Sequence, residues 1–308
     1  MEDASKKWFV IVNPTSGNGK AKRKWPNIER LLKQHQFDFE FAFTQYEKHS
    51  VYLVQKAIRD QFKHIICVGS DGTLHNTVNG IMAQKLVSSQ VIQVGVIPIG
   101  TGNDWVKTYN IPNTMESAIE IIKKGHIASQ DIGKIEFEND HREPIYFNNL
   151  AGVGFDGYVV SRVETYKKWG ALAYLIGALS GMFSFRNFNT RLHVNSKVIS
   201  GKTLMILIGI CQYSGGGMQL THTPNPSDGL FDISYVGNLN KLEIIKNLPK
   251  LFNGTITNYK KVKIFKAASV RIELTGKSQP LIQADGELTG TGNFKVSVIP
   301  RAFSFYTS

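Results

Sequence analysis

The sequence contains little cysteine and no long apolar run. Its 308 residues include only two cysteines, Cys67 and Cys211, and each lies in an apolar stretch without a second thiol or a histidine at metal-ligand spacing. We expect both thiols to be reduced core residues, as is typical of a cytosolic protein. The longest nearly uncharged stretch, residues 171–185, is shorter than the roughly 20 residues that cross a bilayer. A buried or interfacial helix is expected there instead.

Acidic side chains are also in deficit, since 24 acidic residues against 36 basic ones leave a net charge of +12. This excess of positive charge favours an anionic partner. The charge alone does not decide whether that partner is a nucleotide phosphate, a nucleic acid or a membrane surface. The N-terminal residues lack the basic and apolar segments of a secretory signal, so none is predicted. With 42% apolar side chains, the chain has enough for one large domain or two medium ones, which excludes disorder and small disulfide scaffolds.

Strands and helices alternate in the first part of the sequence. Compact β-prone runs at residues 8–12, 37–43, 64–68 and 91–97 are each followed by apolar residues at helical spacing. The third helix is expected to begin at about His75, and a last helix is expected over residues 114–124. Because this alternation requires crossover connections, residues 1–128 are predicted to form a three-layer αβα domain around a parallel sheet.

From about residue 130 the pattern changes to β-rich runs with few helices between them. These runs lie at residues 131–137, 145–150, 191–198, 204–212, 231–236, 262–266, 269–274, 281–284 and 294–299. Helical insertions are expected at residues 158–185 and 241–252. Residues 129–308 are therefore predicted to form a mostly antiparallel β-sandwich or barrel-like sheet, and the last strand could return to the first domain.

Three glycine-rich loops, at residues 13–19, 69–73 and 100–104, each follow a predicted parallel strand. Loops of this kind meet at the carboxyl edge of the sheet, where such sheets bind ligands. Glycine lets backbone amides approach a phosphate, and the following helix starts add partial positive charge, so the first loop suits a nucleotide. By itself the first loop favours an ordinary turn, and the Walker pattern is absent around Lys20.

Two carboxylates, Asp71 and Asp104, stand in the second and third loops. Side by side they would repel each other unless a cation joined them, and oxygen ligands suit Mg²⁺. Each could instead cap its following helix, and the two roles are compatible. Residues 285–287, Asp-Gly-Glu, indicate a hairpin turn when considered alone, because Asp-Gly is a leading hairpin signal.

Five motifs taken together resemble the bacterial diacylglycerol kinase-like lipid kinases, a family whose wider membership includes sphingosine kinases. The motifs are Asn13-Pro-Thr-Ser-Gly17, Gly69-Ser-Asp-Gly-Thr73, Pro98-x-Gly-Thr-Gly-Asn-Asp104, Asn225-Pro-Ser-Asp-Gly-Leu230 and Asp285-Gly-Glu287. The resemblance implies an αβα domain like those of phosphofructokinase and NAD kinase, then a β-sandwich domain, with the active site in the cleft. It also implies ATP- and Mg²⁺-dependent transfer of the γ-phosphoryl group to the hydroxyl of a diacylglycerol-like lipid.

The same resemblance implies a role for particular residues. Asp285 would be the base for the lipid hydroxyl and Glu287 its partner, while Asp71 and Asp104 would belong to the acidic network around the catalytic metal. A second, structural Mg²⁺ would be held by Asn225, Asp228 and the carbonyl of Leu230, with Asp232 assisting. ATP would be bound by Asn13, Pro14, Thr15, Ser16, Gly17, Thr44, Ser70, Asp71, Gly72, Thr73, Leu74, His75, Asn76 and Thr101.

Two departures from the family pattern bear on nucleotide binding. Ser70 stands where a second glycine is usual, and Asn76 where a glutamate is common. If the backbone at Ser70 needs a positive φ, the strain would weaken nucleotide affinity. His75 is expected at a solvent-exposed helix start. Two alternatives are kept: a soluble NAD kinase-like enzyme, and a nucleotide- or lipid-sensing protein without turnover.

The lipid partner is expected at a membrane surface, with the protein cytoplasmic or membrane-peripheral. Residues 171–185 carry apolar side chains at helical spacing between flanking basic residues, which suits anionic headgroups or, equally, a helix packed over the sheet. No nucleic acid partner is expected, and a homodimer is left open. Nothing in the motifs selects among diacylglycerol, another glycerolipid, a sphingoid base and a polyprenyl alcohol.

Overall fold

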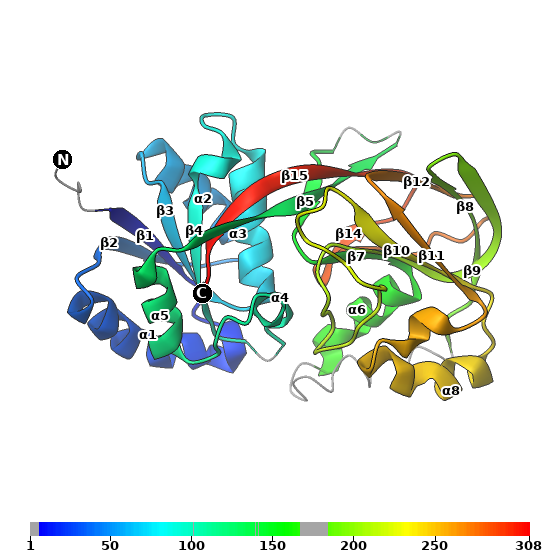
Figure 1. Cartoon of the computed structure of the whole chain (residues 1–308), viewed down its shortest axis with the longest axis horizontal. Coiled ribbons are helices and arrows are strands. Elements are labelled where there is room, and N and C mark those ends of the chain that lie inside the picture. The colour runs from blue at the N-terminus through cyan, green and yellow to red at the C-terminus, as the bar shows by residue number, and fades with distance from the viewer. Residues whose placement is uncertain (1–5, 101, 139, 141, 167–183) are drawn as a thin grey trace. The chain divides into compact units, whose positions relative to one another are not determined.

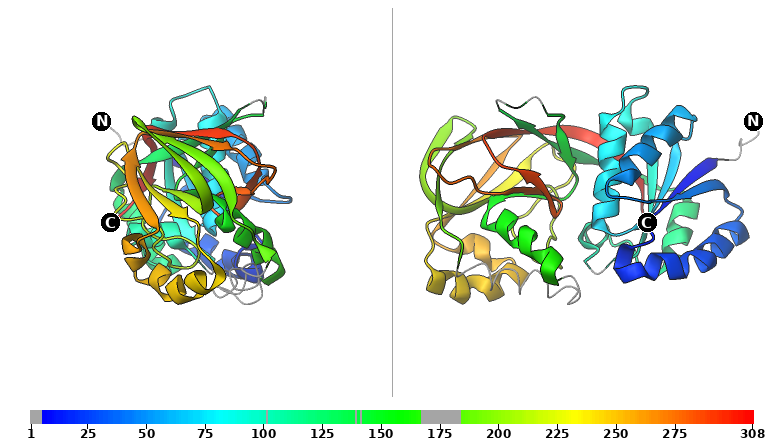
Figure 2. Two further views of the ribbon diagram at one scale, coloured as in Figure 1. Left: turned by 90° about the vertical axis from the view of Figure 1, so that its right-hand side faces the viewer. Right: turned by 180° about the vertical axis from the view of Figure 1, so that it is seen from behind.

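The structure is a computed structural model that describes residues 6–100, 102–138, 140, 142–166 and 184–308, without the side chains of residues 163–166. The chain divides into two compact units, which Figures 1 and 2 show coloured along the chain. Unit 1 comprises Met1–Gln130 and Arg301–Ser308, and unit 2 comprises Asp131–Pro300. Almost all of the helix expected over residues 171–185 lies outside the described residues.

Unit 1 is built on a parallel sheet with the strand order β15–β4–β3–β1–β2. The strands are β1 (Lys7–Val12), β2 (Asp38–Phe43), β3 (His64–Gly69), β4 (Gln93–Pro98) and the end of β15 (Phe294–Tyr306). β15 pairs with β4 through Ser304 and Phe305. The central strands read as continuous apolar runs because both of their faces are buried.

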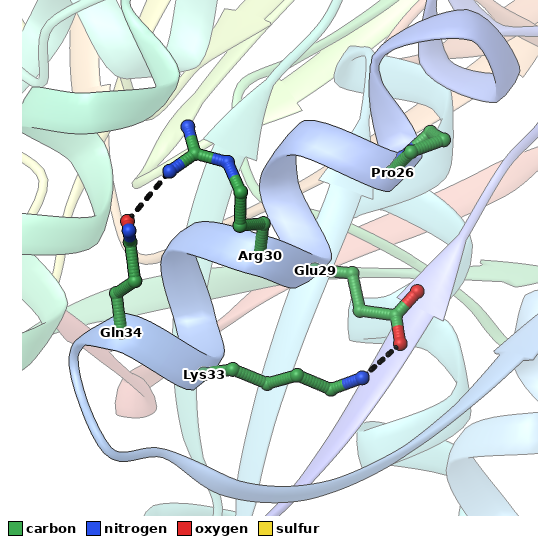
Figure 3. A pocket seen from close by; sticks show the side chains of 5 residues that line it. All are labelled: Pro26, Glu29, Arg30, Lys33 and Gln34. Carbon is green, nitrogen blue, oxygen red and sulfur yellow. Dashed lines mark hydrogen bonds and ion pairs between the residues drawn. The ribbon is translucent and has the colours of Figure 1, made fainter.

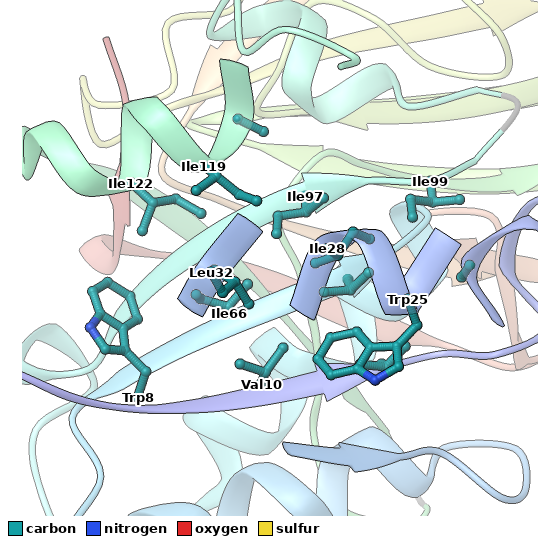
Figure 4. Packing of buried hydrophobic residues seen from close by; sticks show 14 of the residues in the cluster. Trp8, Val10, Trp25, Ile28, Leu32, Ile66, Ile97, Ile99, Ile119 and Ile122 are labelled. Atoms are coloured by element: carbon teal, nitrogen blue, oxygen red, sulfur yellow. The ribbon is translucent and has the colours of Figure 1, made fainter. Parts of the chain in front are cut away.

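Helices cover both faces of this sheet. They are α1 (Ser16–Gln34), α2 (His49–Arg59), α3 (Asp71–Ala83), α4 (Asp104–Thr108), α5 (Met115–Lys124) and the short 3-10 helix η1 (Ser89–Val91). On one face, Trp8 and Val10 of β1 belong to the same buried cluster as Ile28 of α1 and Ile119 of α5 (Figure 4). On the other face, Thr77 of α3 donates a hydrogen bond to the sulfur of Cys67 on β3. The predicted three-layer αβα arrangement is confirmed.

Unit 2 is dominated by antiparallel pairing in the order β14–β13–β7–β9–β8–β12–β15, with β10 pairing with β9 and β11, and β5 with β6. Its strands are β5 (Ile127–Phe137), β6 (Ile145–Phe147), β7 (Leu150–Gly154), β8 (Phe188–Val194), β9 (Lys197–Gly209), β10 (Phe231–Gly237), β11 (Val262–Ala267), β12 (Ser269–Leu274), β13 (Ile282–Ala284), β14 (Glu287–Gly290) and β15. Its helices are α6 (Phe155–Tyr166), α8 (Lys241–Phe252) and η3 (Thr255–Asn258). The predicted change to an antiparallel β-domain is confirmed.

Some local expectations differ from the structure. The third helix, α3, begins at Asp71 and not near His75, because the Ser70 carbonyl already accepts the amides of Thr73 and Leu74. The run predicted as one strand over 191–198 is a hairpin that turns at Asn195, whose φ is 53°. The run at 145–150 is likewise divided, because β6 ends at 147 and β7 begins at 150.

Two other expectations concern the thiols and membrane crossing. Both cysteines are free and buried as predicted, and burial raises the pKa of Cys67 to about 12, so this thiol is inert at neutral pH. Within the part of the chain that the structure describes, every helix is too short or too polar to cross a membrane.

Candidate functional site

The first and second glycine-rich loops are joined by hydrogen bonds at the carboxyl edge of the unit 1 sheet. The Asn13 side chain donates to the hydroxyl of Thr73 at 3.0 Å, and the hydroxyl of Ser16 lies 3.3 Å from the same oxygen. Thr44 lies at the same edge, because its amide donates to the carbonyl of Val12 at 2.9 Å. The structure therefore brings together residues 60 positions apart that were predicted to hold a nucleotide.

The first loop turns through three consecutive left-handed residues. Gly17, Asn18 and Gly19 have φ values of 60°, 56° and 79°, and the regular part of α1 begins only after them. Left-handed backbone favours glycine, with asparagine the next most tolerant residue, which explains the Gly-Asn-Gly sequence. A turn of this kind ahead of a helix presents backbone amides that suit an anion such as a phosphate.

The second and third loops are joined through Asp71. Its carboxylate oxygens accept the amide of Asp104 at 3.1 Å and the amide of Trp105 at 3.3 Å. Asp71 therefore caps α4, which begins 33 residues later, a role that the capping of its own following helix did not anticipate. Asp71 holds the third loop in place whatever ligand binds there.

One oxygen of Asp71 and one of Asp104 face the same small volume above Gly102. A Cβ atom added to Gly102 would lie 3.3 Å from Oδ2 of Asp71 and 3.6 Å from Oδ2 of Asp104. Asp104 as a whole is only 4% exposed, and its other oxygen pairs with the ammonium of Lys107 at 2.8 Å. Mg²⁺ in phosphoryl-transfer enzymes is typically held by one or two carboxylates together with phosphate oxygens and water. Asp71 and Asp104 fit such an ion.

This pair would need oxygens from a ligand or water to complete a metal site. No group of three or more acidic, histidine or cysteine side chains among the described residues is arranged to hold a metal ion. Asp71 and Asp104 would hold such a metal, which would neutralise charge on the phosphates of a bound nucleotide.

The third loop is supported by a polar contact that the sequence did not reveal. The side-chain oxygen of Gln130 accepts both the indole N–H of Trp105 and the hydroxyl of Tyr109, each at 2.7 Å. The Trp105 ring also packs edge-on against Phe305 with centroids 4.9 Å apart. These contacts fix α4 against the rest of unit 1. Thr101, predicted to contact the nucleotide, lies outside the described residues.

The second loop differs from expectation at two residues. Ser70 has an extended backbone with φ −98°, so the strain considered for a serine at this position does not arise. His75 is 5% exposed and its ring lies 3.3 Å from the side-chain nitrogen of Asn79, so the expected solvent-exposed position was wrong. Leu74 is similarly buried at 2%. Any contact that Leu74 and His75 make with a nucleotide would use their backbone.

We expect Gly69→Ala to weaken ATP binding about tenfold, equivalent to roughly one hydrogen bond. A Cβ at this position would lie 2.3 Å from the hydroxyl oxygen of Thr73, which must then move away from Asn13. Calorimetric titration with ATP measures the effect, and thermal unfolding checks the fold. Gly276→Ala is the matched control, because its Cβ would meet nothing closer than 3.7 Å. An unchanged ATP affinity in Gly69→Ala would contradict a binding role for this loop.

In unit 2, Asp285 and Gly286 form the two-residue turn between β13 and β14. Their φ values are 52° and 85°, as a type I′ hairpin turn requires, so the hairpin interpretation describes the backbone correctly. The carboxylate of Asp285 accepts the amides of Asn148, Asn149 and Leu150 at 3.0, 2.9 and 3.0 Å. Glu287 follows immediately as the first residue of β14. The turn thus holds the two predicted catalytic carboxylates of unit 2.

Two residues that the sequence did not single out support this turn. Gln283 is 2% exposed, its amide oxygen accepts the N–H of Gly286 at 2.8 Å, and its amide nitrogen donates to the carboxylate of Asp156 on α6. Burial raises the pKa of Asp156 to about 6, and the hydrogen bond from Gln283 opposes part of that rise. The orientation of the Gln283 amide is set from both of its ends.

Asp156→Asn is expected to stabilise the protein above pH 6. The folded state holds the Asp156 proton more tightly than the unfolded state does. The free energy of unfolding therefore decreases as the pH rises from about 4 to about 6, and it stays lower above pH 6. Asparagine removes the ionised form, and its oxygen can still accept from Gln283. Allowing for partial exposure, we expect a gain of about 1–2 kcal/mol at pH 8.

Urea unfolding of both proteins at pH 8 and pH 5 measures this effect, with Asp38→Asn on the exposed strand β2 as control. The stability difference between wild type and Asp156→Asn should shrink at pH 5. A variant less stable than wild type at pH 8 would contradict the assigned cause.

The residues predicted for a second magnesium are directed to protein partners. The side-chain oxygen of Asn225 accepts the amide and hydroxyl of Ser227, each at 3.1 Å, and one oxygen of Asp228 accepts the amide of Leu230 at 3.0 Å. The other oxygen of Asp228 lies 3.6 Å from the ammonium of Lys266. Because this positive charge lies so close to Asp228, the side chains as they lie do not fit a divalent cation.

A surface pocket lies elsewhere in unit 1, along α1 (Figure 3). It is lined by Pro26, Glu29, Arg30, Lys33 and Gln34. Arg30 donates to Gln34 at 2.8 Å and Lys33 to Glu29 at 2.6 Å, so its polar side chains are paired with one another. None of the predicted nucleotide or metal residues lines it.

Two family models match the chain, one in each half. The "Diacylglycerol kinase catalytic domain" matches residues 7–135, and the "YegS C-terminal NAD kinase beta sandwich-like domain" matches residues 149–307, which is more than half of the chain. The chain belongs to the diacylglycerol kinase-like family of lipid kinases. It is accordingly an enzyme of the lipid kinase class, and membership of a kinase family implies ATP as the phosphoryl donor.

Individual relatives cover nearly the whole chain. "Putative lipid kinase YtlR" of Bacillus subtilis (strain 168) is 27% identical over 306 residues, which are 95% of this chain and 97% of that protein. A diacylglycerol kinase of Staphylococcus carnosus (strain TM300) is 28% identical over 285 residues, 91% of this chain and 88% of its own. A crystal structure of a diacylglycerol kinase from Bacillus anthracis str. Sterne has the same fold, with a TM-score of 0.74 at 21% identity over 100% of this chain and 98% of that one.

Proposed function

We propose that this lipid kinase transfers the γ-phosphoryl group of ATP, with Mg²⁺, to the hydroxyl of a diacylglycerol-like lipid. The observation that carries the proposal is the single hydrogen-bonded assembly of three loops in unit 1. Asn13 bonds to Thr73, and Asp71 holds the third loop so that its oxygen and that of Asp104 face one volume. Amides of the first loop suit the phosphates, and the carboxylate pair suits the metal.

In the proposed reaction, the lipid oxygen forms a bond to the γ-phosphorus while the bond from that phosphorus to the β,γ-bridging oxygen breaks, releasing ADP. Bound Mg²⁺ would neutralise charge on the phosphates. Asp285 orients the hydroxyl and accepts its proton late in the transfer, because a carboxylate is too weak a base to remove it beforehand. The proposal requires the γ-phosphate bound by unit 1 to reach the hydroxyl held by Asp285 of unit 2.

Incubation with ATP labelled on the γ-phosphate, Mg²⁺ and separate acceptors tests this function. The acceptors are diacylglycerol, monoacylglycerol, a sphingoid base and a polyprenyl alcohol in mixed micelles, and NAD in detergent-free buffer. We expect labelled phosphatidic acid from diacylglycerol. A labelled product from NAD alone would favour the soluble NAD kinase-like alternative, and no product from any acceptor would favour the sensing protein.

We also propose that the enzyme meets its lipid by reversible, salt-sensitive contact with a membrane surface. The net charge of +12 favours anionic headgroups. Raising the salt concentration from about 0.1 M to about 1 M shortens the Debye length from about 10 Å to about 3 Å. In sedimentation with phosphatidylglycerol vesicles, we expect the bound fraction to fall several-fold over this range. Equal binding at both salt concentrations, or to neutral phosphatidylcholine vesicles, would contradict a charge-based contact.

A further inference from the structure

The ammonium group of Lys266 lies among the oxygens of the loop that leads into β10. It is 3.2 Å from Oδ2 of Asp232, 3.6 Å from Oδ2 of Asp228 and 3.5 Å from the carbonyl oxygen of Thr223. Three oxygens from three positions of one loop thus surround a single positive charge. This is the loop in which the motif Asn225-Pro-Ser-Asp-Gly-Leu230 raised the expectation of a structural Mg²⁺.

Strand pairing determines where Lys266 lies. β10 and β11 are antiparallel, and their register places Asp232 directly opposite Lys266. The Asp232 side chain is only 1% exposed, so its charge needs a nearby cation. A lysine ammonium carries its charge at neutral pH, and the ion-pair distance to Asp232 is short enough for it to serve as that cation.

Two further polar residues, Asp131 beside the loop and Asn225 within it, have partners from the protein itself. Asp131, which is 1% exposed, accepts the amide of Gly229 at 2.7 Å, and its own amide donates to the carbonyl of Pro226 at 2.7 Å. The side-chain oxygen of Asn225 is used within the loop, by Ser227. The loop is thus tied to β5 at one side and to β11 at the other by contacts that need no metal.

We infer that Lys266 is the resident cation of the loop at residues 223–232, and that its ammonium takes the place of the structural Mg²⁺ that the family resemblance implies. A divalent ion bound to Asp228 would lie within a few ångströms of the ammonium and be repelled by it. The loop therefore folds without metal. The inference concerns unit 2 alone and does not depend on which lipid is phosphorylated.

Thermal unfolding and metal analysis of nucleotide-free protein test the inference without using activity. Wild type should hold no tightly bound divalent cation after dialysis, and its Tm should be the same in EDTA and in millimolar Mg²⁺. Lys266→Met keeps the aliphatic stem but leaves Asp232 without its cation, so we expect its Tm in EDTA to fall by about 5 °C or more. Millimolar Mg²⁺ should restore part of that loss in Lys266→Met only.

Lys263→Met is the matched control, since Lys263 is an exposed lysine on the same strand, and its Tm should stay at the wild-type value. Either of two results would overturn the inference. One is a wild-type protein that retains one equivalent of divalent cation or loses Tm in EDTA. The other is a Lys266→Met variant whose Tm falls no further than that of Lys263→Met.

Discussion

Asp285→Asn is expected to lower kcat for lipid phosphorylation by at least about 10²-fold, the usual loss when a positioned base is removed. The variant should still bind ATP, because the three glycine-rich loops belong to unit 1. Steady-state assays with labelled ATP measure kcat, and calorimetry measures ATP affinity. Asp38→Asn, which changes an exposed carboxylate, should retain full activity. An Asp285→Asn enzyme within about tenfold of the wild-type kcat would reject the assigned role.

The structural role of Asp285 must be separated from its catalytic role. The carboxylate of Asp285 accepts hydrogen bonds from three backbone amides. In Asp285→Asn the side-chain NH₂ would face one of those amide N–H groups, which lowers the free energy of unfolding by about 1–3 kcal/mol. A domain with a stability of about 5–15 kcal/mol remains folded after such a loss. Partial unfolding therefore cannot account for a hundredfold fall in kcat. Thermal unfolding of the same sample gives its Tm. Running the activity assay well below that temperature ensures that kcat is measured on folded enzyme.

Asp71→Asn and Asp71→Ala are both expected to lower kcat/KM for MgATP by about 10²-fold or more, because each removes a carboxylate that faces the proposed metal. Their stabilities should differ. Alanine leaves the amides of Asp104 and Trp105 without their acceptor, at a cost of about 0.5–2 kcal/mol, whereas asparagine keeps one acceptor oxygen.

Kinetics at varied Mg²⁺ concentration together with urea unfolding separate the two roles of Asp71. Asp60→Asn is the control, because Asp60 is a half-exposed carboxylate of unit 1 that forms an ion pair with Lys56 on the protein surface. Asp71→Asn with wild-type kcat/KM would show that Asp71 serves only to cap α4. Equal stability of Asp71→Ala and wild type would instead reject the capping role.

Much of the fold could be predicted because its signals are local. Alternating strands and helices predicted the parallel sheet of unit 1, and therefore that the loops after β1, β3 and β4 share one edge. The Asp-Gly pair predicted the turn at 285–286 from two residues alone. Local signals failed at the start of α3, where the same residues could belong either to the loop or to the first turn of the helix. Asp71 to His75 were read as loop and helix start, although the Ser70 carbonyl already places them within α3.

The parts of the candidate site that could not be predicted depend on pairing between distant residues. Nothing near Asp71 in the sequence indicates that its carboxylate accepts amides of α4, and nothing near Asp285 indicates the amides of residues 148–150. Likewise, the place of Lys266 follows from the register of β10 and β11, which is a property of the folded sheet. The motifs predicted which residues bind ligands or react, and only the tertiary structure shows what each side chain contacts.

The return of residues 301–308 to unit 1 has a consequence for the order of folding during synthesis. Ser304 and Phe305 pair with β4, and Tyr306 is 1% exposed within the core cluster beneath α1 and α5. A ribosome makes residues 1–130 first, but their sheet lacks this edge strand until Tyr306 has left the exit tunnel. The nascent unit 1 must therefore wait, with an open sheet edge, for the whole second unit to be translated.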